Sequence, residues 1–164
     1  MEIRCAWCNK VIKEDESHSE HPSISHGICP DCAFNLEYNT IPLQEFINSL
    51  DPAVIVVDSD VKIQTANQTA LTHLQKSLSQ IKDQLGGDII ECANAALPGG
   101  CGKTEKCASC GIRTSVNQTY STGKPLNDVK FFQYIKGPEG IKRVTLTLST
   151  KKVGNSVVLR IDGI

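Results

Sequence analysis

Eight cysteines carry most of the chemistry that this sequence offers, and they fall into two groups of four. The first group consists of Cys5, Cys8, Cys29 and Cys32. It forms two Cys-x2-Cys pairs separated by twenty residues, and two such pairs complete the closed tetrahedral shell of structural zinc. We therefore predict one structural Zn²⁺ at these four residues. The alternative is two disulfides or free buried thiols.

The second group consists of Cys92, Cys101, Cys107 and Cys110, with the spacing Cys-x8-Cys-x5-Cys-x2-Cys. Glycines between them allow close backbone approach, so four sulfurs could surround one metal. The spacing matches neither ferredoxin arrangement, so a second Zn²⁺ and an iron–sulfur cluster both stay open. A reversible dithiol switch also fits, because Cys107 and Cys110 precede an expected helix start and Lys103, Lys106 and Arg113 would favour thiolates. The remaining interpretation is that these four cysteines serve only in packing.

Charge and targeting signals narrow the function classes. The 164 residues carry a formal net charge of -1. Three basic and eight acidic residues give residues 1–50 a net -5, which leaves +4 for residues 51–164. This balance argues against a nucleic-acid partner, since nucleic-acid domains usually present a basic face. With no membrane-length apolar run and no signal peptide, we expect a cytoplasmic protein, in which lasting disulfides are uncommon.

Three segments must position these cysteines. Residues 1–35 hold too few apolar side chains to fold without a metal, and their polar loop at 17–26 contains His18, His21 and His26. Residues 36–50 read as a connecting helix, because Leu43, Phe46, Ile47 and Leu50 recur at helical spacing after Pro42. Residues 51–164 read as one domain, with the second cysteine group in an insertion at 92–110.

The last segment has the element order of an α+β fold. Strands are expected at 53–58, 61–65, 129–135, 142–150 and 156–161. Helices are expected at 67–74, 78–85 and 114–122, with a glycine-rich loop at 97–103. We predict a five-stranded antiparallel sheet with helices on one side. The loop is not a phosphate loop, because it lacks the first glycine of that motif and no strand leads into it.

Two stretches resemble known families. Residues 5–32, above all Ser25-His-Gly-Ile-Cys29-Pro30, resemble a zinc ribbon attached to many bacterial signalling proteins. Residues 44–164 resemble a PAS sensor domain, through Ser49–Asp58, Ile63–Asn67 and the three closing strands. The stretch at 87–113, with Gly-Gly-Cys-Gly-Lys-Thr and Cys-x2-Cys-x-Ile-Arg, resembles a cysteine-bearing insertion of a subset of PAS domains.

The PAS resemblance implies a sheet around a pocket, frequent dimerisation and signal transfer through the termini. A PAS fold without ligand, used only for docking, is the alternative. The residues disfavour two familiar cofactors. No Gly-x-Asn-Cys-Arg-Phe motif for a flavin photosensor is present, and His73 is the single histidine of this segment available to haem.

We therefore expect a cytoplasmic signal-transduction protein that senses redox state or metal through the second cysteine group. The ribbon and the Leu43–Leu50 helix would then contact a second protomer or a partner such as a histidine kinase or regulator. The competing hypothesis is a passive adaptor in which both cysteine groups are structural. We do not expect the protein to be an enzyme. The one enzymatic activity for which the sequence offers a motif is that of a thiol oxidoreductase using Cys107 and Cys110. Because no output domain follows, we expect either a fragment or a protein that acts through a separate partner.

Overall fold

The computed structural model describes residues 2–13, 24–38 and 42–163, and it begins with a small sheet. This sheet has the order β2-β1-β3 and is formed by β1 (Glu2–Cys5), β2 (Val11–Lys13) and β3 (Ile24–Gly27). β1 is antiparallel to β2 and parallel to β3. His26 therefore lies in a strand and not in the expected loop. His18 and His21 lie outside the described residues.

Two short helices replace the single connecting helix expected at 36–50. α1 (Pro30–Tyr38) begins with proline in its first turn, where the missing N–H costs nothing, and α2 (Leu43–Asn48) follows. Pro42 has the extended backbone angles φ -53° and ψ 135°, so a helix cannot run through it into α2. Residues 39–41 of the expected helix lie outside the described residues.

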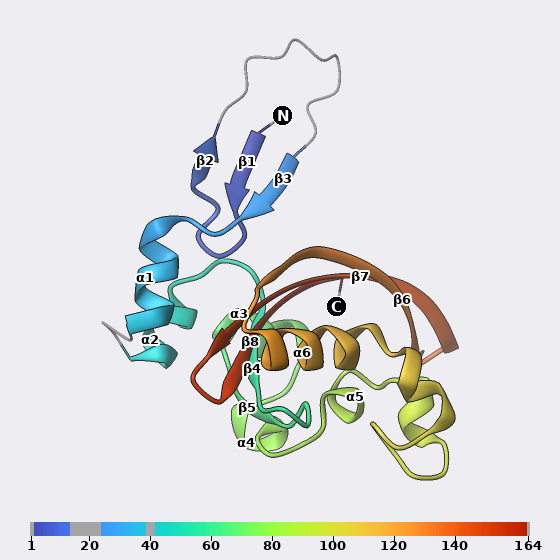
Figure 1. The fold of residues 1–164 in the computed structure, drawn as a ribbon. Helices are drawn as coiled ribbons and strands as arrows, with labels where there is room; N and C mark the ends of the chain where they lie inside the picture. Colours follow the sequence, from blue (N-terminus) through green and yellow to red (C-terminus); the bar gives the residue numbers. More distant parts are fainter. Residues whose placement is uncertain (1, 14–23, 39–41, 164) are drawn as a thin grey trace.

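The rest of the chain forms a five-stranded sheet, as predicted, with the order β5-β4-β8-β7-β6 among the described strands. Its strands are β4 (Val54–Val57), β5 (Ile63–Ala66), β6 (Leu126–Gly137), β7 (Gly140–Val153) and β8 (Ser156–Asp162). Every neighbouring pair is antiparallel. The fold class is α+β, and the sheet curves around the helices that follow β5 (Figure 1).

These helices lie between β5 and β6 in the sequence and cover one face of the sheet. They are α3 (Gln68–Leu74), α4 (Leu78–Ile81), α5 (Gly86–Ile89) and α6 (Gly111–Thr122), with short 3₁₀ turns at Ala93–Ala96 and Glu105–Ser109. Ile81, Ile112 and Val116 pack from them against Leu146, Leu148 and Leu159 of the sheet. No helix in the described part of the chain is long and apolar enough to cross a bilayer.

The opposite, outer face of β4 and β8 is covered by the N-terminal module and α2. Val54, Val56 and Val158 are at most 1% exposed there. They share a core with Trp7, Leu36, Phe46 and Ile47. Both faces of β4 are thus buried, which explains its unbroken apolar sequence. Phe46, Ile47 and Leu50 are buried within the chain itself, so the expected partner contact of the Leu43–Leu50 helix would have to use its other side chains.

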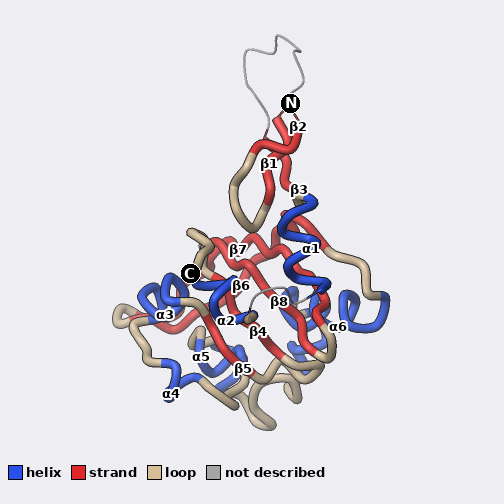
Figure 2. The backbone as a smooth tube through the Cα atoms, turned by 90° about the vertical axis from the view of Figure 1, so that its left-hand side faces the viewer, coloured by secondary structure: helices blue, strands red, loops and turns tan. Residues whose placement is uncertain are grey.

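Asn67 joins the two layers. Its side chain is fully buried, and its Oδ1 accepts hydrogen bonds from the N–H groups of Val54 and Ala70, both at 2.9 Å. Its Nδ2 donates to the carbonyl oxygens of Ile47 at 3.0 Å and Pro52 at 2.8 Å. One amide therefore caps α3, fixes the start of β4 and ties down the end of α2. Figure 2 shows α2, α3 and β4 meeting on this side of the molecule.

Candidate metal centre and cysteine-lined pocket

The first four cysteines come together at the base of the N-terminal module. The sulfurs of Cys5, Cys8, Cys29 and Cys32 all lie within 4.8 Å of one another, and such a group could hold a metal ion. Cys5 ends β1, and Cys32 lies in the first turn of α1, so each Cys-x2-Cys pair is anchored to one regular element. Cys5, Cys29 and Cys32 are buried, while Cys8 is exposed.

The surroundings of these sulfurs favour a thiolate at Cys5 and oppose ionisation of Cys8 and Cys32. The backbone N–H groups of Trp7 and Cys29 point at the Cys5 sulfur, each at 3.4 Å, and the Cys32 N–H points at the Cys29 sulfur at 3.4 Å. The Cys32 thiol, aided by these amides, lowers the pKa of Cys5 to about 4 against the opposing effect of burial. The same contact with Cys5, and then burial, raises the pKa of Cys32. Only a cation at the centre would ionise all four, so the donor set fits a metal.

The candidate metal centre is part of the sheet domain's core. Trp7, the residue between Cys5 and Cys8 that is 1% exposed, packs in the cluster that contains Val56 and Val158. Two polar contacts reinforce this junction. The Arg160 guanidinium of β8 donates to the Ala6 carbonyl oxygen. On β3, the backbone N–H of His26 donates to Asp128 Oδ2 at 3.1 Å, and its Nδ1 lies 3.0 Å from Oδ1.

The second four cysteines lie along one edge of the sheet domain. Cys92 forms a bridge with Ile135 of β6, Cys107 lies in the 3₁₀ turn at 105–109, and Cys110 is the N-cap of α6. Cys101 lies in the glycine-rich loop, and its sulfur would be 2.6 Å from a Cβ at position 87, so a side chain there would displace the thiol. In the described residues these four sulfurs do not form a group as compact as the first. A second metal and a dithiol switch both remain predictions.

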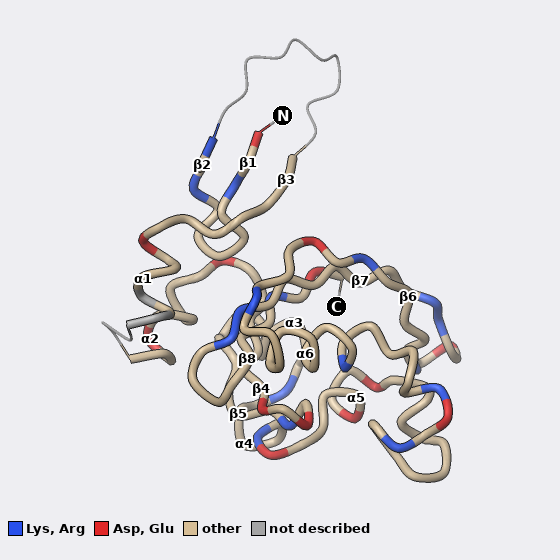
Figure 3. The backbone as a smooth tube through the Cα atoms, viewed as in Figure 1, with Lys and Arg blue, Asp and Glu red and all other residues tan. Residues whose placement is uncertain are grey.

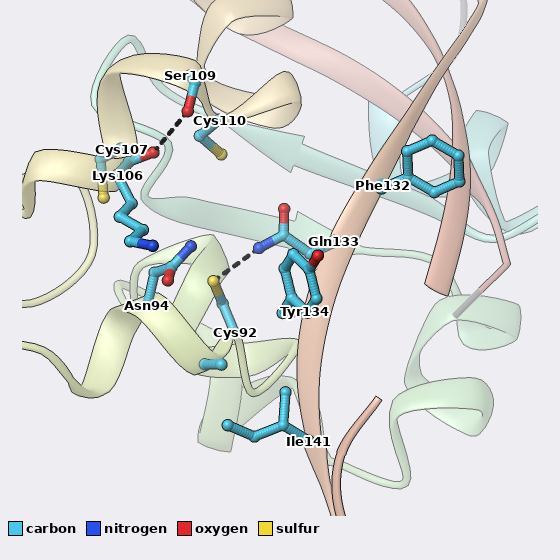
Figure 4. Close-up of a pocket in the computed structure, with 11 residues that line it drawn as sticks. Cys92, Asn94, Lys106, Cys107, Ser109, Cys110, Phe132, Gln133, Tyr134 and Ile141 are labelled. Carbon is cyan, nitrogen blue, oxygen red and sulfur yellow. Dashed lines mark hydrogen bonds between the residues drawn. The ribbon is translucent and has the colours of Figure 1, made fainter. Parts of the chain in front are cut away.

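Three of these cysteines line one pocket of about 370 Å³ beside β6. Cys92, Cys107 and Cys110 form its thiol side, with Asn94, Lys106 and Ser109 beside them. In Figure 4 the Cys92 and Cys110 side chains point towards the space in front of β6. Cys101 lines the neighbouring pocket of about 380 Å³ with Lys62, Lys103 and Arg113. The insertion thus places its thiols in two adjacent pockets.

Gln133 is the functional side chain that sequence reasoning missed. It is 5% exposed, and its Nε2 donates to the Cys92 sulfur at 2.7 Å (Figure 4). The signal was present in the strand pattern: Gln133 occupies an inward position between Phe131 and Ile135, where an apolar residue would be expected. A buried polar side chain on a core-facing position needs a partner, and here the partner is a thiol.

The pKa values of Cys107 and Cys110 are shifted in opposite directions. Burial opposes ionisation of Cys107, but hydrogen bonds from the Thr104 hydroxyl at 3.1 Å and the Gly102 N–H at 3.2 Å, with the Arg113 charge, lower its pKa overall. Burial raises the pKa of Cys110, and the charges of Cys92 and Cys101 add to this shift. Cys107 therefore ionises at a lower pH than Cys110.

Among solved structures, this chain is similar to several PAS domains. The RpfR quorum-sensing receptor PAS domain from Cronobacter turicensis, in complex with BDSF, has a TM-score of 0.46 and 13% identity over 70% of this chain and 94% of that one. The PAS domain of nitrogen regulation protein NR(II) from Vibrio parahaemolyticus has a TM-score of 0.48 and 16% identity over 76% and 100%. The photoactive yellow protein domain of the sensor histidine kinase Ppr from Rhodospirillum centenum has a TM-score of 0.46 and 12% identity over 73% and 91%.

No protein-family model and no curated protein matches the chain. The description of residues 51–163 as PAS-like therefore rests on their own strand order, their antiparallel register and the helices on one face.

Proposed function

We propose that this chain is a cytoplasmic signal-transduction module whose PAS-like domain senses redox state or a metal through Cys92, Cys101, Cys107 and Cys110. A structural Zn²⁺ at the first four cysteines would hold the N-terminal module in place. The observation that carries the proposal is the pocket beside β6. It brings Cys92, Cys107 and Cys110 to one cavity and links Cys92 directly to the strand through Gln133.

A change at these thiols would reach two elements. Gln133 joins Cys92 to β6, and the backbone N–H of Lys136 donates to the Glu91 carbonyl oxygen at 2.9 Å, so residues 91–92 pair with the edge of the sheet. Cys110 is the N-cap residue of α6 and lines the same pocket. Oxidation of two thiols by a hydroperoxide forms one disulfide, with release of water and an alcohol. Movement of either sulfur would break the Gln133 contact or shift the start of α6, which would bias the position of an element.

The test uses protein purified without oxygen. Zinc, iron and free thiols are quantified before and after addition of a hydroperoxide, with the ultraviolet–visible spectrum recorded in parallel. The proposal expects one zinc that persists, together with a loss of two thiols or of a coloured iron centre in the oxidised sample. Cys92→Ser and Cys110→Ser variants should lose that response, whereas Cys8→Ser should lose the zinc. Unchanged metal content, thiol count and oligomeric state after oxidation would refute sensing.

The second candidate function is a passive adaptor for a kinase or regulator, in which both cysteine groups are structural. It is favoured by the way the first four cysteines share a core with the sheet domain. Two zinc ions per chain that resist mild oxidation would support this reading over sensing.

An oxidoreductase activity at Cys107 and Cys110 is the remaining alternative. Reduction of insulin by the protein with a thiol cosubstrate would establish it, and we expect no reduction above the rate of the thiol alone.

A further inference from the structure

The outer face of the five-stranded sheet is covered by the chain over only part of its width. On β4 and β8, the outward valines lie under α2 and the N-terminal module. On β6 and β7, three large apolar side chains point outwards and are exposed: Phe132 is 57% exposed, Tyr134 49% and Ile141 62%. Exposed apolar groups that lie side by side mark interaction sites, whereas isolated ones need no explanation.

The strand register brings these side chains together. Phe132 pairs with Thr145, Tyr134 with Arg143, and Lys136 with Ile141. Even-numbered residues of β6 share one face because side chains alternate along a strand. Ile141 is therefore a diagonal neighbour of Tyr134, within reach of an aromatic ring. We define the hairpin patch as these outward residues: Lys130, Phe132, Tyr134, Lys136, Ile141 and Arg143.

The charge of the hairpin patch has one sign. Lys130, Lys136 and Arg143 are cationic, and the patch contains no carboxylate. Neighbouring acidic side chains are already paired: Glu139 lies 3.8 Å from Lys142, and Asp162 lies 3.1 Å from Arg160. Within the described residues no ion pair is recorded for the three cations of the patch. Figure 3 shows Lys and Arg residues along the outer part of the β6–β7 hairpin.

The positive charge of the hairpin patch distinguishes between its candidate binding partners. A two-fold dimer through the patch would bring three cations against three cations and would be disfavoured. A single-stranded nucleic acid would need free aromatic faces, but the Arg143 guanidinium lies 3.6 Å from the centroid of the Phe132 ring and covers one of them. An acidic protein segment satisfies the cations and buries the apolar side chains together.

We propose that the hairpin patch binds an acidic segment of a partner protein that presents two or three apolar side chains. This inference names a partner chemistry for the proposed signalling function. Phe132, Tyr134 and Ile141 also line the pocket that contains Cys92, Cys107 and Cys110. A partner on the patch would therefore lie at the mouth of the cysteine pocket, where it could respond to the state of the thiols.

The test titrates fully reduced, ¹⁵N-labelled protein with a synthetic amphipathic peptide of glutamate and leucine. A matched peptide of lysine and leucine is the charge control. The proposal expects saturable amide shifts confined to residues 130–136 and 141–145 with the acidic peptide. Its affinity should fall as salt rises.

Two double variants test the two parts of the recognition separately, one replacing cations of the patch and the other replacing apolar side chains. Lys130→Glu with Arg143→Glu, and separately Phe132→Ser with Ile141→Ser, should each weaken acidic-peptide binding by about 10-fold or more. Lys124→Glu and Leu97→Ser are the matched controls, because Lys124 and Leu97 are exposed residues outside the patch, and they should change affinity by less than about 2-fold. Amide spectra of each variant confirm that it folds.

Four outcomes overturn the proposal: no shifts, equal binding of the basic peptide, binding of a polyuridine oligonucleotide at the patch in place of the acidic peptide, or concentration-dependent dimerisation that the patch variants abolish. Peptide binding is read from amide shifts of reduced protein, whereas thiol sensing is read from metal content and thiol count. A failure of one is therefore distinguishable from a failure of the other.

Discussion

Loss of the proposed metal from the first four cysteines should destabilise the whole chain and not only the N-terminal module. The perturbation is Cys8→Ser, or removal of the ion from unaltered protein with a chelator. Cys8 is the exposed member of the group, so its replacement removes a metal ligand with little loss of packing. The three buried thiols would then lack the cation that allows all of them to ionise.

The magnitude follows from the outer face of the sheet. Val54, Val56 and Val158 are at most 1% exposed under the module. Uncovering a buried valine costs about 1.5–3 kcal/mol, so the three together cost about 4.5–9 kcal/mol. Domains of this size are stable by about 5–15 kcal/mol, so the sheet domain should lose much of its stability with the module.

The assay uses the single tryptophan. Trp7 is 1% exposed between two of the cysteines, so its emission should shift to longer wavelength when the module opens. Urea unfolding followed by circular dichroism reports the sheet domain in the same samples. Lys124→Ala is the control, because Lys124 is exposed and lies outside both cysteine groups, and it should leave both signals unchanged. The reasoning is refuted if metal loss is complete by elemental analysis while Trp7 emission and the urea midpoint stay constant.

Three further predictions concern the sheet domain. Asn67→Ala should lower the free energy of unfolding by about 2–4 kcal/mol in urea titrations, because it leaves buried backbone groups of α2 and β4 without partners; an effect below about 1 kcal/mol would contradict that role. In metal-free reduced protein, alkylation of Cys107 should reach its half-maximal rate at lower pH than that of Cys110, since the pKa of Cys107 is lowered and that of Cys110 is raised; mass spectrometry of the alkylated sites checks the order, and the reverse order would contradict it. Gly111→Ala should destabilise the start of α6, because the new Cβ would lie 2.3 Å from the Phe131 ring; a melting temperature equal to that of the unaltered protein would show that the ring moves freely.

The sequence predicted the features that depend on local pattern. The spacing of Cys5, Cys8, Cys29 and Cys32 was enough to predict one cluster, and alternating residues such as Thr145, Leu146 and Thr147 located β7. The same alternation placed Gln133 inwards, but nothing local indicated Cys92 as its partner 41 residues away. Long-range pairing of this kind is set by the register of β6 against the insertion, which no periodicity reveals.

Two other differences have physical causes. α6 begins at Gly111 and not at 114, and the Phe131 ring fills the space where a side chain at 111 would lie, so the first turn of the helix accepts glycine. The apolar stripe of Phe46, Ile47 and Leu50 correctly indicated a helix with one buried face. It could not indicate whether that face meets another molecule or the chain's own β4, because periodicity reports that a face is buried and not what covers it.

The position of β8 has a consequence for the order of folding. β8 lies between β4 and β7, although it is the last strand of the described chain. Its Arg160 reaches back 154 residues to Ala6, and Val158 completes the core beneath Trp7. During synthesis, the first four cysteines could bind the proposed metal as soon as Cys32 emerges, but the surface on which the module rests is incomplete until β8 is made. Until then the module lacks part of the surface against which Trp7 packs, and apolar surface exposed at this stage favours aggregation of the nascent chain.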